Sequence, residues 1–322
     1  MNRYLHLAAA AALVAAAGAF LVLFPGEAYA PLADRTESPS VRVLFLGDVM
    51  LDRHIRAQAR LSGYDSLLEP LALLFGAHDI VVFNLEGPVT DNPSTSTGSI
   101  VGSSRNYVFT FEPASVVALR RVAGEAKLVA HLGNNHIDNF GTAGIRETEV
   151  HLKENNISYF GSPLEDVRAL VLETPGGLIA LVSYNQFGGS ATSSLAALAE
   201  APGAFTVLFA HWGEEYLSEP APYVRDLAHR FVEAGAKMVV GSHPHVFENS
   251  EQYNGVHLYY SLGNAIFDQY WDKSVSCGAA LSVTFKEGDV VATELIPLKM
   301  EYSGRTLYGE AAEGCKISGD ML

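Results

Sequence analysis

From residue 41 onward, short apolar runs alternate with amphipathic helical stretches, and this alternation constrains the fold most strongly. The apolar runs are rich in Val, Ile, Phe and Tyr and are bounded by Gly, Asn or Asp, as buried strands are. The predicted strands are residues 41–46, 80–84, 127–132, 157–160, 178–184, 205–210, 237–240 and 256–261. The predicted helices are residues 65–75, 114–123, 143–155 and 223–234. This order is typical of βαβ units, so we expect an α/β fold with a mostly parallel sheet.

Near the C-terminus the pattern changes to a hairpin. Residues 279–285 and 290–297 are apolar runs on either side of Glu287-Gly288-Asp289, a sequence suited to a tight turn. The two cysteines, Cys277 and Cys315, lie in this last part of the chain. In an oxidising compartment they could pair and join the C-terminal tail to the body, and neither lies in a sequence typical of a catalytic thiol.

The composition narrows the classes of function. Hydrophobic residues make up 48% and charged residues 18% of the chain, which is enough apolar material for a full core and excludes general disorder. The formal net charge of −15 argues against a nucleic-acid partner, because Lys and Arg drive phosphate binding.

The N-terminus indicates export. Residues 7–24 form an unbroken apolar stretch after Arg3, and Ala28-Tyr29-Ala30 fits the small-x-small pattern of a signal-peptidase site. We therefore interpret residues 1–30 as a signal peptide or an N-terminal membrane anchor. Residues 31–40 read as a linker, 41–300 as the folded domain and 301–322 as a C-terminal tail. In either interpretation the protein is extracytoplasmic, secreted or anchored in the cell envelope.

Polar residues that can bind metal follow one predicted strand after another. Because the carboxyl ends of parallel strands meet along one edge of a sheet, such residues are expected to lie together. They are Asp48, Glu86, Asn134, Asn135, His136, Asp138, His211, His243 and His245. A single Asp after a strand is more often a helix cap or turn former, and a lone His is usually structural, so the argument depends on the recurrence.

Imidazole, carboxylate and amide oxygen together form a ligand set for Zn, Mn or Fe, whereas Mg and Ca prefer shells of oxygen alone. We expect one or two such divalent ions per chain. Other catalytic patterns are missing from the sequence: it contains no G-x-S-x-G, no Walker loop and no H-E-x-x-H.

Six segments in register resemble the CapA family of poly-γ-glutamate capsule biosynthesis proteins, a branch of the calcineurin-like metallophosphoesterase superfamily. The segments are FLGDVML, VFNLEGPVT, GNNHIDNFG, AHWGEEY, GSHPHVF and YYSLGNAIFDQ, spanning roughly residues 42–270. The resemblance implies a four-layer α/β/β/α sandwich with the metals at its strand ends. It also implies a role for each site residue. The implied metal ligands are Asp48, Glu86 as the bridging carboxylate, Asn135, His211, His243 and His245.

The resemblance also makes His136 the candidate general acid or electrostatic stabiliser. Two departures from the superfamily pattern bear on the site. Met50 stands where the motif Asp-x-His has its histidine, so one metal would lose an imidazole. The family usually has an Asp three residues after His136, but Asn139 stands there and Asp138 comes one position early, so either side chain could orient His136.

The resemblance implies an extracytoplasmic, metal-dependent hydrolase-like protein of the cell envelope, with a surface polymer or γ-glutamyl peptide as substrate. Capsule-synthesis proteins and the membrane are further expected partners. Two other functions stay open. One is a non-catalytic component that assists export or anchoring of the polymer, and the other is a metallophosphoesterase for small substrates.

Overall fold

The computed structural model describes residues 38–201, 203–315 and 317. The predicted signal or anchor segment and most of the linker therefore lie outside the described residues. The chain from Ser38 onward forms one compact unit, and the domain boundaries expected from the sequence stay a prediction. Within the described part, a search for helices of sufficient length and hydropathy to span a bilayer finds none.

The strands belong to two sheets. The first sheet contains β1 (Ser40–Val49), β2 (Ile80–Leu85), β3 (Lys127–His131), β4 (Ser158–Phe160), β11 (Asn264–Ile266), β12 (Cys277–Lys286), β13 (Asp289–Met300) and β14 (Thr306–Tyr308). Its order is β14-β13-β12-β1-β2-β3-β4, with β11 pairing with β1. Strands β1 to β4 run parallel, whereas β12 to β14 are antiparallel additions.

The second sheet contains β5 (Leu170–Thr174), β6 (Gly177–Asn185), β7 (Phe205–His211), β8 (Met238–Ser242), β9 (Ser250–Tyr253) and β10 (Val256–Tyr259). Its order is β5-β6-β7-β8-β10-β9. The inner strands β6, β7, β8 and β10 are parallel, and an antiparallel strand closes each edge.

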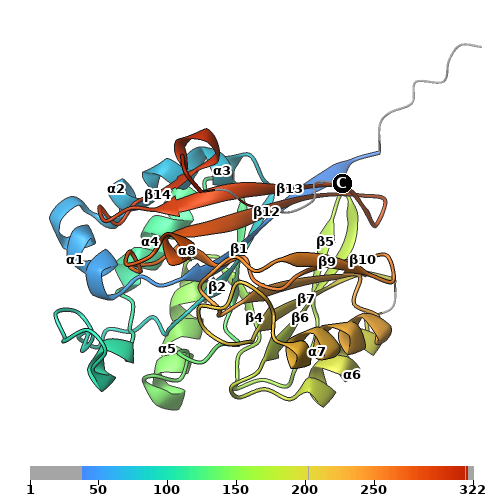
Figure 1. Cartoon of the computed structure of the whole chain (residues 1–322), viewed down its shortest axis with the longest axis horizontal. Helices are drawn as coiled ribbons and strands as arrows, with labels where there is room; N and C mark the ends of the chain where they lie inside the picture. Colours follow the sequence, from blue (N-terminus) through green and yellow to red (C-terminus); the bar gives the residue numbers. More distant parts are fainter. Residues whose placement is uncertain (1–37, 202, 316, 318–322) are drawn as a thin grey trace, which may run out of the picture. The chain divides into compact units, whose positions relative to one another are not determined.

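The longer helices are α1 (Arg53–Ser62), α4 (Pro113–Val122), α5 (Gly141–Glu154), α6 (Ala191–Ala199) and α7 (Pro222–Glu233). The short ones are α2 (Tyr64–Leu68), η1 (Glu69–Leu71), α3 (Ala72–Gly76), η2 (Ser104–Tyr107), α8 (Lys273–Ser276) and η3 (Gly309–Ala311). Figure 1 shows α6 and α7 together on the second sheet, while α1, α2 and α3 lie at the first sheet beside β14.

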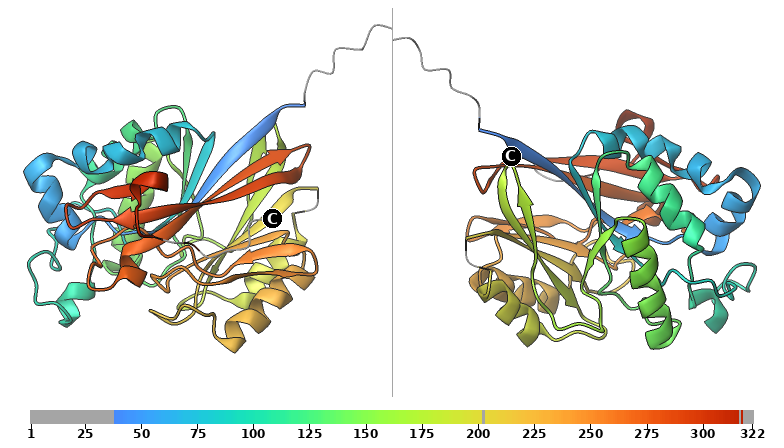
Figure 2. Two further views of the ribbon diagram at one scale, coloured as in Figure 1. Left: turned by 45° about the horizontal axis from the view of Figure 1, so that its top comes forward. Right: turned by 180° about the vertical axis from the view of Figure 1, so that it is seen from behind.

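Alternation along the strands produces three apolar layers. In β1, Val43 and Phe45 belong to a cluster between the two sheets. Leu44 and Leu46 belong to a cluster between the first sheet and the helices α1 to α5. In β7, successive side chains likewise alternate between the inter-sheet cluster and the cluster under α6 and α7. Successive side chains of a strand point to opposite faces, so two covered faces require nearly continuous apolar runs. The expected four-layer α/β/β/α sandwich is thereby confirmed, and Figure 2 shows the two sheets as separate layers.

The predicted strands and the hairpin are present, with ends shifted by at most three residues. The predicted helix 65–75 is interrupted, because Pro70 lies in the 3-10 turn between α2 and α3. The sequence analysis missed α1, α6 and four short strands, β5, β9, β11 and β14. The edge strands β5 and β9 carry few buried residues, so they lack a clear apolar pattern.

Cys277 and Cys315 form a disulfide. It joins the first residue of β12 to the segment after η3, so it holds the end of the described chain against the first sheet. The pairing considered from the sequence is therefore confirmed.

Candidate metal centre

The six predicted metal ligands come from the carboxyl ends of strands in both sheets. Asp48 is the last residue but one of β1, Glu86 follows β2, and Asn135 lies in the loop after β3. In the second sheet, His211 ends β7, and His243 and His245 follow β8. Parallel pairing within each sheet aligns these strand ends, and the packing of the two sheets brings the two sets together.

Asp48, Glu86 and His245 form the first group of donor atoms. Their ligand atoms all lie within 4.8 Å of one another, and all three residues are buried. His245 Nδ1 lies 3.3 Å from Asp48 Oδ2, and His245 Nε2 lies 3.7 Å from Glu86 Oε1. Neither oxygen of Glu86 has a hydrogen-bond partner among the described residues.

Asn135, His211 and His243 form the second group. His211 Nε2 lies 2.9 Å from Asn135 Oδ1 and 3.2 Å from His243 Nδ1. His211 also lies near the first group, because its Nδ1 is 3.9 Å from Asp48 Oδ1. The two groups therefore adjoin each other at Asp48.

A hydrogen bond to a neighbouring side chain decides which ring nitrogen of His245 is free. Asn264 donates its amide hydrogens to Gln269 and Val275, so its oxygen accepts from His245 Nδ1 at 3.0 Å. His245 Nε2 is then left with a lone pair facing Glu86, as in a histidine oriented for metal binding. For His211, the Ser242 hydroxyl lies 3.0 Å from Nδ1 and the Asn135 oxygen lies 2.9 Å from Nε2, so both ring nitrogens have an oxygen neighbour.

The charges at the site are poorly compensated by the protein itself. Burial, and then the nearby charge of Asp48, raises the pKa of Glu86 well above its usual value. Burial would also raise the pKa of Asp48, but hydrogen bonds from His245 and Asn84 and the histidine charges lower it overall. Burial, and then neighbouring histidines, lowers the pKa of His243 to about 3 and that of His211 well below its usual value. Neutral imidazoles beside a buried carboxylate without partners match the needs of a divalent cation, so the residues present fit one.

His136 lies beside the first group. Its Nε2 is 4.0 Å from Glu86 Oε1, and its ring packs on Phe109 with centroids 4.2 Å apart. Burial lowers the pKa of His136 to about 4, although the hydrogen bond to Asn139 opposes this.

The two candidates for orienting His136 differ in position. Asn139 Oδ1 accepts from the Phe109 N–H at 2.7 Å and lies 3.3 Å from His136 Nδ1. The side chain of Asp138 is exposed, and among the described residues no hydrogen bond joins it to His136. Of the two candidates, only Asn139 therefore contacts the His136 ring among the described residues.

Two more asparagines complete the site: Asn84, which the sequence analysis missed, and Asn134, to which it gave no role. Asn84 donates to Asp48 Oδ1 at 2.8 Å and accepts from Asn134 at 3.1 Å. Asn134 also donates to the carbonyl of Leu85 and accepts from the His136 N–H. The available signal for Asn84 was its position two residues before Glu86 at the end of β2, but an asparagine there is ordinary.

The backbone at the site is constrained. His243 has φ 99° and His245 has φ 61°, values that side-chain-bearing residues seldom adopt. Gly47, directly before Asp48, allows β1 to approach the loop before β11, because a Cβ there would clash with the Gly263 carbonyl. Met50 is fully buried, and its sulfur accepts from the Asp52 N–H at 3.1 Å.

A cavity of about 900 Å³ lies beside the second group of donors. Its wall includes Asn135 from the site, Phe187, and residues of the loop after β4. Phe187 also packs on the His243 ring with centroids 4.3 Å apart. The cavity therefore gives an extended ligand room to lie next to the site.

Comparisons with known proteins find one family model and several similar proteins. The family model "Bacterial capsule synthesis protein PGA_cap" matches residues 42–269. The capsule biosynthesis protein CapA of Bacillus anthracis is 27% identical over 301 residues, covering 85% of this chain and 71% of that protein. The PGA biosynthesis protein CapA of Bacillus subtilis (strain 168) is 27% identical over 279 residues, covering 79% of this chain and 70% of that protein. A Thermotoga maritima protein solved by NMR is 15% identical with a TM-score of 0.34, covering 79% of this chain and 98% of that one.

Proposed function

Because the chain belongs to the PGA_cap family of bacterial capsule synthesis proteins, we propose that it is an extracytoplasmic, metal-dependent hydrolase. Its role is in the synthesis or processing of a poly-γ-glutamate capsule or a related surface polymer. The relatives are named for capsule or PGA biosynthesis, which supports the pathway. The proposal assigns the polymer, or a γ-glutamyl peptide derived from it, as the substrate.

The observation that carries the enzymatic part is the unpartnered Glu86 carboxylate beside Asp48 and His245. A buried carboxylate without hydrogen bonds is costly unless a cation accompanies it. The proposed ligands are Asp48, Glu86, Asn135, His211, His243 and His245, for one or two ions of Mn, Zn or Fe. A divalent ion bound there would supply Lewis-acid activation of the scissile carbonyl or phosphoryl group.

The other residues would orient the substrate and move protons. Asn139 Oδ1 accepts the Nδ1 proton of His136, so Nε2 of the neutral ring faces the site with a free lone pair. From this position His136 Nε2 would accept a proton from the attacking water and then pass it to the leaving group. Phe109 covers one face of the ring and limits access of water.

Two observations support the proposed location outside the cytoplasm. The N-terminal apolar stretch with its small-x-small motif is typical of an exported protein. The Cys277–Cys315 disulfide is of the kind that persists in oxidising compartments. A membrane attachment through residues 1–30 and contacts with other capsule-synthesis proteins are part of the same proposal.

The first test is the metal content of the purified full chain, measured by elemental analysis. We expect one or two Mn, Zn or Fe ions per chain, and a loss of that metal in the His243→Ala/His245→Ala variant. The metal-loaded protein should also cleave a γ-glutamyl oligomer. Arg60→Gln, a change at the exposed side of α1, is the matched control and should keep both properties. A chain that binds no metal even after reconstitution would refute the enzymatic proposal.

Met50 favours a second candidate, a non-catalytic component for polymer export or anchoring. The buried thioether replaces an imidazole that one metal of the superfamily uses. A metal-loaded chain that binds the γ-glutamyl oligomer without cleaving it would support this candidate. Turnover of a chromogenic phosphodiester that disappears in His136→Ala would instead indicate a phosphoesterase.

A further inference from the structure

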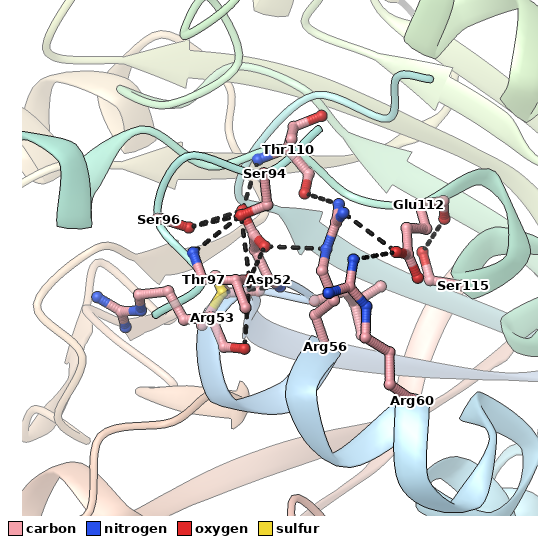
Figure 3. Close-up of polar contacts among 12 residues, drawn as sticks. Asp52, Arg53, Arg56, Arg60, Ser94, Ser96, Thr97, Thr110, Glu112 and Ser115 are labelled. Carbon is pink, nitrogen blue, oxygen red and sulfur yellow. Dashed lines mark hydrogen bonds and ion pairs between the residues drawn. The ribbon is translucent and has the colours of Figure 1, made fainter. Parts of the chain in front are cut away.

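Arg53 is held in an unusual backbone conformation near the metal centre. It is the first residue of α1 and has φ 51°, in the left-handed region that favours glycine. The residue before it, Asp52, is fully buried and accepts hydrogen bonds from Ser96, Thr97 and the Thr110 N–H at 2.7, 2.9 and 3.0 Å. Asp52 also pairs with Arg56 at 3.0 Å. Figure 3 shows this cluster around Asp52, with the Arg53 side chain extending away from it. The cluster therefore fixes the strained backbone and sets the direction of the Arg53 side chain.

Two aromatic rings connect the Arg53 guanidinium with the site histidines. Its Cζ lies 5.0 Å from the ring centroid of Phe109 and 5.3 Å from that of Phe267. The same rings contact site histidines: Phe109 packs on His136 at 4.2 Å and Phe267 packs on His245 at 4.7 Å between centroids. Each ring thus contacts both the Arg53 guanidinium and a histidine of the site.

The Arg53 guanidinium has an N–H donor without a hydrogen-bond partner among the described residues. Its Nη2 pairs with Asp268, whose second oxygen accepts the His54 N–H at 3.1 Å. Its Nε is buried without a partner among the described residues. The side chain as a whole is 12% exposed, so part of it is accessible to solvent.

We propose that Arg53 is a substrate-binding residue that holds a carboxylate of the polymer next to the metal centre. The inference rests on the proposed function, because it takes the α-carboxylate of a γ-glutamyl unit as the group bound. A protein with a formal net charge of −15 needs a localised cation to accept a polyanion. The planar guanidinium suits a carboxylate, and the flanking rings keep it desolvated and correctly oriented.

The test is calorimetric binding to the full chain loaded with Mn²⁺. The probes are a γ-glutamyl pentapeptide, its analogue with α-carboxamides in place of the carboxylates, and inorganic phosphate. We expect the wild-type chain to bind the pentapeptide about tenfold or more tightly than the carboxamide analogue. Arg53→Gln should lose that preference, and Arg53→Lys should keep part of it.

Two further variants separate substrate binding from a structural role. Arg60→Gln should bind as the wild type does, since Arg60 lies on the same helix with an exposed side chain. Asp268→Asn removes the partner of Arg53, so it should bind the pentapeptide at least as tightly as the wild type. If Arg53 served only the ion pair, Asp268→Asn would weaken binding as much as Arg53→Gln does.

Three results would overturn the inference. They are a preference for carboxylate that survives in Arg53→Gln, a wild type without any preference, and binding of phosphate alone that depends on Arg53. Cleavage is measured separately, in the assay described for the proposed function. If binding of the carboxylate depends on Arg53 but that assay finds no cleavage, the hydrolase proposal is overturned and the role of Arg53 stands.

Discussion

At the scale of single residues, the protonation of His136 depends on a neighbouring oxygen that accepts a hydrogen bond. Asn139 Oδ1 is committed as an acceptor because the Phe109 N–H donates to it, so His136 keeps its proton on Nδ1. A carboxylate at this position would have raised the pKa of His136, whereas the neutral amide leaves burial dominant. Replacing the usual Asp by Asn139 therefore preserves the tautomer and lowers the basicity of His136.

We predict that Asn139→Ala lowers the rate of hydrolysis about 10- to 100-fold, the usual effect of removing a residue that orients a histidine of a metal site. ¹⁵N NMR should show His136 protonated on Nδ1 in the wild type and a mixture of tautomers in the variant. Asp138→Asn is the matched control, because its side chain is exposed, and it should change neither measurement. The opposite ranking of the two variants would mean that Asp138 orients the ring.

A second residue-scale prediction concerns Glu248, which is 2% exposed and has one carboxylate oxygen without a partner among the described residues. Burial raises its pKa to about 8, against the opposing charge of Arg225. Between pH 4.5 and 8 the folded state therefore keeps a proton that the unfolded state releases. The stabilisation is complete below pH 4.5 and is lost as the pH rises to about 8.

Glu248→Gln should therefore stabilise the protein relative to the wild type by an amount that grows with pH, at most about 1.4 kcal/mol for each pH unit in this window. Urea unfolding of both proteins between pH 5.5 and 8 measures the difference. A difference that stays constant across the window would show that Glu248 titrates normally.

At the scale of elements, one buried carboxylate organises a long loop. Asp52 precedes α1 and accepts from Ser94 at 2.9 Å as well as from Ser96, Thr97 and the Thr110 backbone. Residues 91–106 are rich in Ser, Thr and Gly, which by themselves indicate only an irregular segment. Their hydroxyl groups bind Asp52, so the loop is attached to the helix that carries Arg53.

We predict that Asp52→Asn lowers the free energy of unfolding by about 3 to 5 kcal/mol, because it removes a buried charge that is paired with Arg56. Cleavage by protease within residues 91–106 should become faster. Asp65→Asn, which removes an exposed ion pair with Arg121, should have little effect on either measurement. Equal losses in both variants would exclude a special role for Asp52.

At the scale of the whole described unit, the site exists because two sheets pack with their strand ends adjoining. Asp48, Glu86 and Asn135 belong to the first sheet, and His211, His243 and His245 belong to the second. The inter-sheet cluster includes residues of β1, β2, β7, β8 and β12, so packing far from the metal centre holds the two halves of the ligand set in register.

The disulfide is the covalent contribution at this scale. We predict that Cys315→Ser lowers the free energy of unfolding by about 3 to 4 kcal/mol, since Cys277 and Cys315 close a loop with a sequence separation of 38. Urea unfolding with and without reductant measures the change, and the variant should no longer respond to reductant. Titration of the unreduced, denatured wild type should find no free thiol, and two free thiols would contradict the pairing.

The sequence by itself determined the α/β class, the position of most strands and the ligand candidates, because these depend on local periodicity and on residue type after each strand. The hydrophobic pattern did not reveal short edge strands such as β5 and β9, since few of their side chains are buried. The four layers were predicted from the family resemblance, because hydrophobic periodicity does not show whether the strands form one sheet or two.

Only the tertiary structure decided how the candidates group and which atoms are free. The separation into Asp48, Glu86 and His245 on one side and Asn135, His211 and His243 on the other depends on the packing of two sheets. The roles of Asn84, Asn139 and Arg53 depend on contacts with residues far away in the chain. Local sequence carries no signal for such contacts, because hydrogen-bond partners and ring neighbours are set by distances in space.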